Sequence, residues 1–395
     1  MNKPSQSDLE LLREGNPPRD PELLRHLTVN NEWLQVMKDY CLDQVVAAGG
    51  SKVKILFGSS GTGKSHFIND IRVSAEERGF YAISIDLART GYRLTDAVAL
   101  YRALAADLDL DALEQALGAL LLKHLGYEPN QWEEHGGSLS DFLCEYEGAD
   151  LPEARKHIRT CIHEIVNPLE LDFAFRKFLH SFMEAVAERD KDFKDIAKAW
   201  LRGEKVERTN KSATRLYETL ARHNARGWTY SLTEIIKLMG YKGVLLLIDQ
   251  FEAILPQSEA LVHYTPLKRK DIYEFLRQLI DDLDFFKNIL VIVCGDKTII
   301  EDEKNGLQSY HALWMRIQPG FEQQPRLNVY ADLIDADLIY RDLISASDLE
   351  SLRVKLRELG VWDQDGEAKA KTQTADTYAN FRQFVTMSGT GFWGG

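Results

Sequence analysis

A glycine-rich octapeptide at residues 58–65, GSSGTGKS, constrains the fold of this chain more than any other stretch. It matches the pattern G-x-x-x-x-G-K-[ST], in which the backbone N–H groups of a loop surround phosphate oxygens. Residues 53–57 before it have the apolar pattern of a short strand, and Phe67, Ile68 and Ile71 after it have helical spacing. A strand, a glycine loop and a helix in this order predict a phosphate-binding loop.

The residue types within the loop indicate how it would hold a nucleotide. Its three glycines allow backbone dihedrals that a side chain would forbid, and the following helix contributes the positive end of its dipole. We expect Lys64 to neutralise the β- and γ-phosphates of ATP, and the Ser65 hydroxyl to bind Mg²⁺. The predicted nucleotide-binding residues are Gly58, Ser59, Ser60, Gly61, Thr62, Gly63, Lys64, Ser65 and His66.

Two further apolar runs predict strands that are buried on both faces. Residues 243–248 are apolar throughout and end at Asp249, which fits the Walker B carboxylate that holds Mg²⁺. Residues 289–295 form the second run, which ends in the polar Asp296. Because helices separate the strands, we predict a parallel three-layer α/β sheet of the P-loop NTPase type, with the nucleotide at the carboxyl ends of the strands.

The remaining patterns predict two more strands, a large helical insertion and helical ends. Strands are expected at residues 81–86 and 326–330, and helices at 7–14, 31–48, 95–107, 110–125, 152–166, 169–188, 191–202, 211–223, 231–239, 266–286, 347–359 and 375–387. We therefore expect a helical lead-in (1–50), the first part of the NTPase core (51–91), a helical insertion (92–240), the second part of the core (241–334) and a helical C-terminal lid (335–395).

Composition limits the functions that such a chain can have. The 395 residues carry a net charge of −13, which argues against a protein that binds nucleic acid with its whole surface. No apolar run approaches the roughly 18 residues of a membrane helix, and the N-terminus lacks the apolar core of a secretory signal. Four scattered cysteines favour a reducing compartment, so we expect a cytoplasmic protein without membrane association.

One group of residues raises the question of a second metal site. Cys161 lies near His157 and His163 in the sequence. Zinc sites need three or four ligands, and no second ligand pair is apparent in the sequence. We therefore interpret these side chains as ordinary surface and core residues.

Several stretches together resemble the AAA+ and STAND groups of ATPases, and most closely the ATP-binding proteins of BREX-type bacterial anti-phage defence systems. The resemblance extends over roughly residues 8–330. It rests on residues 11–18 (LLREGNPP), 58–67 (GSSGTGKSHF), 75–80 (AEERGF), 85–87 (IDL), 200–204 (WLRGE), 239–243 (MGYKG), and 306–316 (GLQSYHALWMR).

The resemblance implies catalytic roles for residues outside the loop. Asp249 would be the Walker B aspartate and Asp296 the γ-phosphate sensor. Arg316 resembles an arginine finger that reaches the γ-phosphate of a neighbouring subunit, and Arg382 would be a second sensor arginine in the lid.

The residue after Asp249 departs from the pattern of the family. The usual glutamate, which polarises the attacking water, is replaced by Gln250, and glutamine can orient a water but cannot accept its proton. Three explanations are open: an engineered trap, a natural slow ATPase or ATP-dependent switch, or transfer of the role to Glu252.

The resemblance implies an ATP- and Mg²⁺-dependent ATPase of a defence system, which forms a homo-oligomer and works with partners of the helicase or nuclease type. DNA would be engaged through the complex. Two alternatives are a STAND-like scaffold that binds ATP without hydrolysing it, and an origin-type DNA loader. The loader would need a C-terminal helix-turn-helix, and no clear one follows residue 330.

Overall fold

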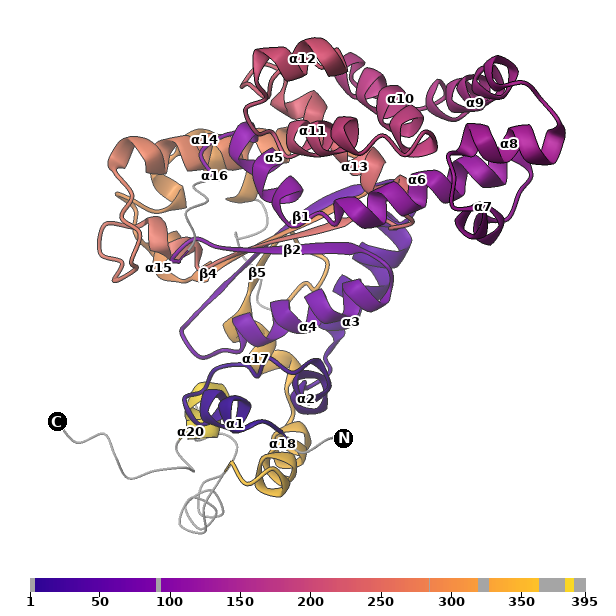
Figure 1. The fold of residues 1–395 in the computed structure, drawn as a ribbon. Coiled ribbons are helices and arrows are strands. Elements are labelled where there is room, and N and C mark those ends of the chain that lie inside the picture. The colour runs from indigo at the N-terminus through magenta and orange to yellow at the C-terminus, as the bar shows by residue number, and fades with distance from the viewer. Residues whose placement is uncertain (1–3, 90–93, 284, 319–326, 362–380, 387–395) are drawn as a thin grey trace. The chain divides into compact units, whose positions relative to one another are not determined.

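The computed structural model describes residues 4–89, 94–283, 285–318, 327–361 and 381–386. Contacts divide the chain into two compact units (Figure 1). The first, which we call the sheet unit, comprises Met1–Arg93 and Val244–Gly395, and the second, the helical unit, comprises Leu94–Gly243.

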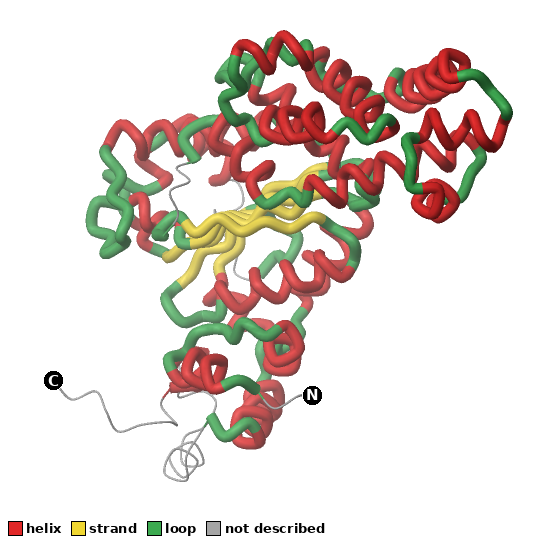
Figure 2. The backbone as a smooth tube through the Cα atoms, viewed as in Figure 1, coloured by secondary structure: helices red, strands yellow, loops and turns green. Residues whose placement is uncertain are grey.

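The sheet unit is built on five parallel strands in the order β2-β3-β4-β1-β5 (Figure 2). This arrangement confirms the predicted parallel α/β sheet of a P-loop NTPase core. The strands are β1 (Ser51–Gly58), β2 (Tyr81–Asp86), β3 (Val244–Asp249), β4 (Ile289–Asp296) and β5 (Leu333–Asp335).

The strand register brings the polar strand ends to one edge of the sheet. Gly58 of β1 lies opposite Asp296 of β4, and Asp86 of β2 lies opposite Asp249 of β3. Strand β4 lies between β1 and β3, so its polar end separates the glycine loop from Asp249. A single edge therefore presents the loop and three carboxylates.

Helices cover both faces of the sheet. On one face, α4 (Lys64–Glu77) contacts β2, β3 and β4, and η1 (Val36–Val46) contacts β1 and β4. The expected helix at 31–48 forms as α3 (Glu32–Gln35) followed by this π-helix, which has the wider i→i+5 turn. Figure 1 shows α14 (Pro266–Asp281) and α16 (His311–Ile317) on the opposite side of the sheet from α4.

The N- and C-terminal helices share a second, smaller core. Helix α18 contacts α2, and α20 contacts α1. Leu12, Leu23 and Leu27 are buried there with Leu352, Leu356 and Phe384. The helices are α1 (Gln6–Arg13), α2 (Pro21–Leu27), α17 (Ala336–Leu343), α18 (Ala346–Glu358) and α20 (Phe381–Thr386). Residues 375–380 and 387 of the expected last helix lie outside the described residues.

The prediction of a strand at residues 326–330 was wrong. The fifth strand is β5, which begins at Leu333, and Arg326 lies outside the described residues. Lys54 of β1 is buried and its Nζ donates to the carbonyl oxygens of Tyr330 and Ala331 at 2.7 and 2.9 Å. Those carbonyls are thereby turned toward an ammonium group, so pairing with β1 starts only beyond them.

The helical unit contains helices and no strand among its described residues. Aromatic side chains dominate its core: the ring centroids of Trp200 and Trp228 are 4.6 Å apart, and Tyr101 and Phe175 pack against Trp228. Its helices are α5 (Ala97–Ala106), α6 (Leu110–Leu125), α7 (Pro129–His135), α8 (Leu139–Glu147), α9 (Leu151–Val166), α10 (Phe173–Ala187), α11 (Lys191–Leu201), α12 (Arg208–Thr214) and α13 (Ala225–Leu238).

Two parts of the helical unit differ from the sequence prediction. The expected helix at 211–223 ends at Thr214, because Arg215 adopts a left-handed conformation with φ 59°. Helices α7 and α8 were not predicted, although Pro129 at the start of α7 and the Ser138 cap of α8 are recognisable start signals.

Short elements complete the sheet unit: η2 (Phe251–Ile254), α15 (Thr298–Glu301) and η3 (Leu307–Ser309). None of the helices in the described part of the chain combines the length and apolar character that a membrane-spanning helix requires.

Candidate nucleotide-binding site

The glycine loop joins β1 to α4 as the motif requires. Gly61 and Gly63 both have φ 89°, a left-handed conformation that other residues adopt at a cost. Gly63 precedes α4 and offers no capping side chain, so the first N–H groups of the helix are available to an anion.

Gly58 has a different reason to be glycine. Its φ is not positive, but a Cβ atom there would lie 2.8 Å from the Cβ of Ala336. The expectation that all three glycines supply unusual dihedrals is therefore wrong for Gly58. Glycine is required at this position because the start of α17 approaches the loop closely.

Lys64, the first residue of α4, folds back over the loop. Its Nζ donates to the carbonyl oxygens of Gly58 and Ser59 at 2.8 and 2.9 Å. The Thr62 hydroxyl donates to the Ser59 carbonyl as well, at 2.9 Å. The loop is thus held by its own polar groups, with the ammonium of Lys64 at its centre.

Carboxylates from neighbouring strand ends lie beside the loop. Asp249 accepts from the Gln250 N–H at 2.8 Å, and Glu252 Oε2 accepts from the Asp296 N–H at 2.9 Å. Burial raises the pKa of Asp249 and the pKa of Glu252, each opposed by hydrogen bonds from backbone N–H groups. A cation would relieve the unfavourable burial of these charges.

Gln250 adopts an unusual conformation at the end of β3. Its φ is 54°, in the left-handed region that non-glycine residues seldom enter. Its Nε2 donates to Asp86 Oδ2 on the neighbouring strand at 3.4 Å. Strained backbone of this kind recurs at functional sites, where the surrounding structure maintains it.

A cavity of about 340 Å³ joins these features. Its walls also include Leu12, Gly15 and Asn16 near α1, Leu352 and Leu356 of α18, and the start of α20. From the predicted site residues it brings together Ser60, Gly61, Gly63, Lys64, Ser65, His66, Asp249, Gln250, Glu252, Asp296 and Arg382. Gly58, Ser59, Thr62 and Arg316 do not line it.

Helix α20 lies directly on the glycine loop. The Arg382 N–H donates to the Gly61 carbonyl at 3.0 Å, and its Nη1 donates to the Ser60 hydroxyl at 3.2 Å. Its Nη2 donates to Asn16 Oδ1 at 3.5 Å. The ring of Phe381 covers Gly63 so closely that a Cβ there would lie 3.0 Å from it. Described residues from the N-terminal and the C-terminal helices therefore both border the cavity.

Arg316 lies elsewhere in the sheet unit. Its guanidinium forms an ion pair with Asp281 of α14, with 2.9 Å between Nη2 and Oδ2, and its side chain is about one third exposed. The side chain does not contact the cavity of its own chain.

His66 connects α4 to the end of α2. Its Nε2 lies 2.9 Å from the Thr28 hydroxyl, which also donates to Asp70 at 3.3 Å. Burial lowers the pKa of His66 to about 4, although the charge of Asp70 opposes this shift. The imidazole is therefore neutral at pH 7.

Two residues that hold the loop were not identified in the sequence. Asp337 of α17 accepts from the Ser59 N–H at 3.1 Å and from the Ser59 hydroxyl at 2.9 Å. Lys297 forms an ion pair with Asp337, and its own N–H donates to the Gly58 carbonyl at 3.2 Å. The position of Lys297 directly after Asp296 was the one feature of the sequence that could have indicated its role. The contact of Asp337 with the loop joins segments that are far apart in the sequence, so no local pattern indicates it.

The fold and the site define a P-loop nucleotide-binding protein of the parallel α/β class. The family model described as BREX system ATP-binding protein BrxC/D matches residues 3–388, and the chain belongs to this family. The resemblance to the ATP-binding proteins of BREX systems is thereby confirmed, and with it ATP binding in an antiviral defence system. No curated protein matches the chain.

Proposed function

We propose that this chain is an ATP- and Mg²⁺-dependent ATPase of a BREX defence system. The observation that carries the proposal is the single cavity that contains Lys64, Ser65 and the carboxylates of Asp249 and Glu252. Phosphate would be bound by the loop N–H groups and Lys64, and the base and ribose would lie between the loop, α1 and α18.

The residues of the cavity fit a magnesium ion. A hydroxyl and a carboxylate are oxygen ligands of the kind Mg²⁺ prefers, and Ser65 and Asp249 supply them. The raised pKa of buried Asp249 supports this assignment, because a bound cation stabilises the ionised form. When bound, Mg²⁺ supplies charge neutralisation at the phosphates.

For hydrolysis we propose Glu252 as the general base. It lines the cavity, and its anchored Oε2 fixes the position of the carboxylate. Burial raises its pKa toward the working pH, which suits a group that accepts a proton from water. Gln250, whose amide nitrogen donates to Asp86, would orient the water or brace the strand end.

We further propose that the site is completed in a homo-oligomer, where Arg316 of one copy reaches the nucleotide of the next. Its position outside its own cavity and its partial exposure support this role. The nucleotide state would then control how the assembly engages DNA or partner proteins of the helicase or nuclease type. The protein would act in the cytoplasm.

Direct binding measurements test the nucleotide site. Titration calorimetry with ATP and Mg²⁺ should give saturable binding, and Lys64→Ala should weaken it at least about tenfold, because it removes a charged phosphate contact. Arg72→Ala is the matched control, since Arg72 lies on the same helix and pairs with Glu76. Equal affinity of Lys64→Ala and the wild type would refute the proposal.

Particle mass tests the assembly. We expect light scattering or mass photometry to show a larger particle with ATP than without it. The same measurement with added duplex DNA, with and without ATP, tests whether the assembly binds DNA. Arg316→Ala should leave ATP binding intact and lower turnover. A monomer under all conditions would contradict the oligomeric part of the proposal while leaving ATP binding standing.

A non-hydrolysing ATP-dependent switch of the STAND type is the second candidate. The observation that favours it is Gln250 at the position of the usual glutamate. Such a protein would bind ATP and assemble, yet release no phosphate above the level of the Lys64→Ala variant.

A further inference from the structure

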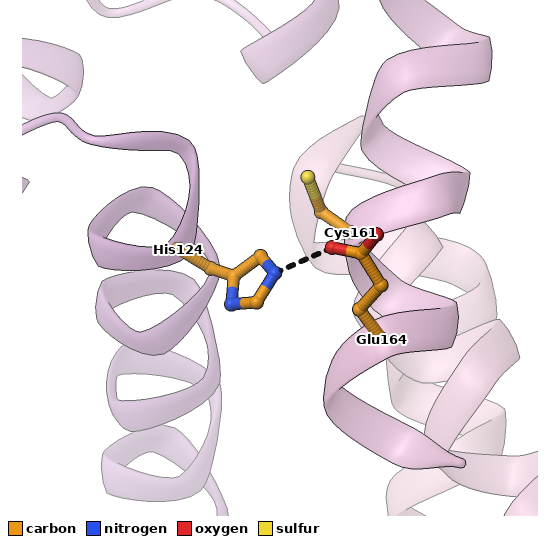
Figure 3. A group of neighbouring side chains, drawn as sticks. All are labelled: His124, Cys161 and Glu164. Carbon is orange, nitrogen blue, oxygen red and sulfur yellow. Dashed lines mark hydrogen bonds and ion pairs between the residues drawn. The ribbon is translucent and has the colours of Figure 1, made fainter.

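Three side chains with different metal-binding atoms converge in the helical unit. His124 lies in the last turn of α6, and Cys161 and Glu164 lie one turn apart on α9. The potential ligand atoms of the three all lie within 4.8 Å of one another. Figure 3 shows the His124 ring pointing toward the Glu164 carboxylate, with Cys161 beside it. His124 Nε2 lies 2.8 Å from Glu164 Oε2.

Local structure explains why these residues meet. Gly126 ends α6 in a left-handed conformation, which leaves His124 in the last turn of the helix. Helix α9 is amphipathic and contacts α6, with Ile158, Cys161 and Ile162 on its buried side. Glu164 lies at the margin of that side and is more than half exposed, so an ion could reach the cluster from solvent.

The surroundings of the cluster favour a cation. Glu147, at the end of α8, accepts from the Tyr127 hydroxyl at 3.0 Å and lies 3.4 Å from His157 Nδ1. The carboxylates of Glu164 and Glu147 give this part of the helical unit a negative potential that attracts cations.

We propose that His124, Cys161 and Glu164 form a binding site for a transition-metal ion of the Zn²⁺ class. Sulfur and imidazole ligands select Zn²⁺ and its neighbours over Mg²⁺ and Ca²⁺, which take oxygen ligands. Zinc sites with three protein ligands keep a fourth position for water or another group. The site connects α6 to α9 and is separate from the proposed ATPase chemistry.

The structure selects different ligands from those considered in the sequence. Near Cys161, His157 pairs with Glu147, and the ring of His163 lies 4.5 Å from that of His180. The third ligand is His124, which comes from another helix. A histidine–glutamate ion pair accounts for His124 and Glu164 alone, so the role of Cys161 distinguishes a metal site from a simple ion pair.

The experiment uses the full chain, stripped with a chelator, reloaded with Zn²⁺ or Co²⁺ and passed through gel filtration to remove unbound metal. We expect the protein to retain stoichiometric Zn²⁺ by mass spectrometry of the metal, and Co²⁺ to produce a near-ultraviolet thiolate-to-cobalt charge-transfer band. Cys161→Ser should abolish the band and weaken Zn²⁺ binding by about tenfold or more. Cys144→Ser, on α8 of the same unit, is the matched control and should bind like the wild type.

Two further measurements keep the test decisive. His124→Gln, at a partly exposed position, should also weaken Zn²⁺ binding. This variant replaces Cys161→Ser as the test if circular dichroism shows that Cys161→Ser disturbs the fold. ATP affinity should be the same in all variants. The proposal is overturned if the wild type retains no Zn²⁺, or if Cys161→Ser binds it as tightly as the wild type.

Discussion

Glu252 and Gln250 line the same cavity but are anchored in different ways. Glu252 holds the Asp296 N–H through one oxygen, whereas the side chain of Gln250 donates to Asp86. A carboxylate can take a proton from water, and an amide can only orient the water. We therefore expect the two side chains to have separable effects on turnover.

Exchanging the side chains at these positions tests which one is the base. Glu252→Gln should lower ATP turnover by about 100-fold or more, the usual contribution of a general base, with little change in ATP affinity. Gln250→Glu should change turnover far less. Steady-state phosphate release measures both, with Glu301→Gln as an exposed control. A large gain in Gln250→Glu with little loss in Glu252→Gln would identify Gln250 as the trap.

The acidity of Glu252 predicts a pH dependence. Burial raises its pKa above the ordinary value of 4.5, and a base acts only when ionised. Turnover should therefore hold above the raised pKa and fall as pH decreases through it. A pH profile of kcat should show this acidic limb in the wild type and lack it in Glu252→Gln. An identical limb in both proteins would assign the titration to another group.

Asp337 stabilises the glycine loop from outside the motif. Burial alone would raise its pKa, but Lys297 and Ser59 outweigh burial, so the net pKa is lowered and the group is ionised at pH 7. Asp337→Ala removes the acceptor of the Ser59 N–H and hydroxyl, and should weaken ATP binding about tenfold. Calorimetry measures this loss. Asp342→Ala, in the same helix and paired with Arg341, should have no such effect.

Helix α20 contributes more to the site than its six residues suggest. Arg382 and Phe381 contact three positions of the glycine loop, and Phe384 is buried in the core shared with α1 and α18. The hydrophobic pattern of a short C-terminal helix indicates that it packs somewhere. It does not indicate on which loop the helix lies.

Truncating Arg382 tests whether α20 closes over the nucleotide. Arg382→Ala keeps the backbone bond to Gly61 but loses the contacts with Ser60 and Asn16. We expect ATP affinity to fall about tenfold, because a charged donor beside the phosphates is lost. Arg13→Ala, which removes a bond to the Gly360 carbonyl in the same small core, is the control. Unchanged affinity in Arg382→Ala would mean that α20 only packs.

The two units have separate hydrophobic cores. The core of the sheet unit combines β1, β3 and β4 with α4 and η1, and the aromatic cluster around Trp228 belongs to the helical unit alone. Every residue that lines the nucleotide cavity comes from the sheet unit. Loss of packing in the helical unit should therefore affect stability without removing the site.

Trp228→Ala tests this division. The side chain is fully buried, so its removal should cost about 3–5 kcal/mol of unfolding free energy. Calorimetric and denaturant unfolding of the full chain should show the loss, while ATP affinity at 25 °C stays unchanged. Phe173→Ala, at an exposed position of the same unit, should cost little. Loss of ATP binding in folded Trp228→Ala would show that the units are coupled.

Local patterns predicted most elements of the fold. The glycine loop and the buried strands before Asp249 and Asp296 are each contained in a short run of sequence, because strand and loop chemistry is local. The helical insertion at 92–240 was recognised from the absence of any strand pattern in that stretch. The predicted strand at 326–330 was misplaced because the Lys54 ammonium binds a backbone carbonyl there. The predicted helix at 211–223 was misplaced because Arg215 adopts a left-handed conformation that ends the helix. In those places, a distant contact or a single left-handed residue outweighs periodicity.

The sequence alone determined that the chain has a phosphate-binding loop, an Asp249 carboxylate and a parallel α/β sheet to carry them. Only the tertiary structure placed β4 between β1 and β3, Asp337 and α20 on the loop, and His124 beside Cys161. The physical reason is sequence separation. A loop motif is fixed by its own dihedrals, whereas contacts between distant segments depend on strand order and on how helices pack across the core.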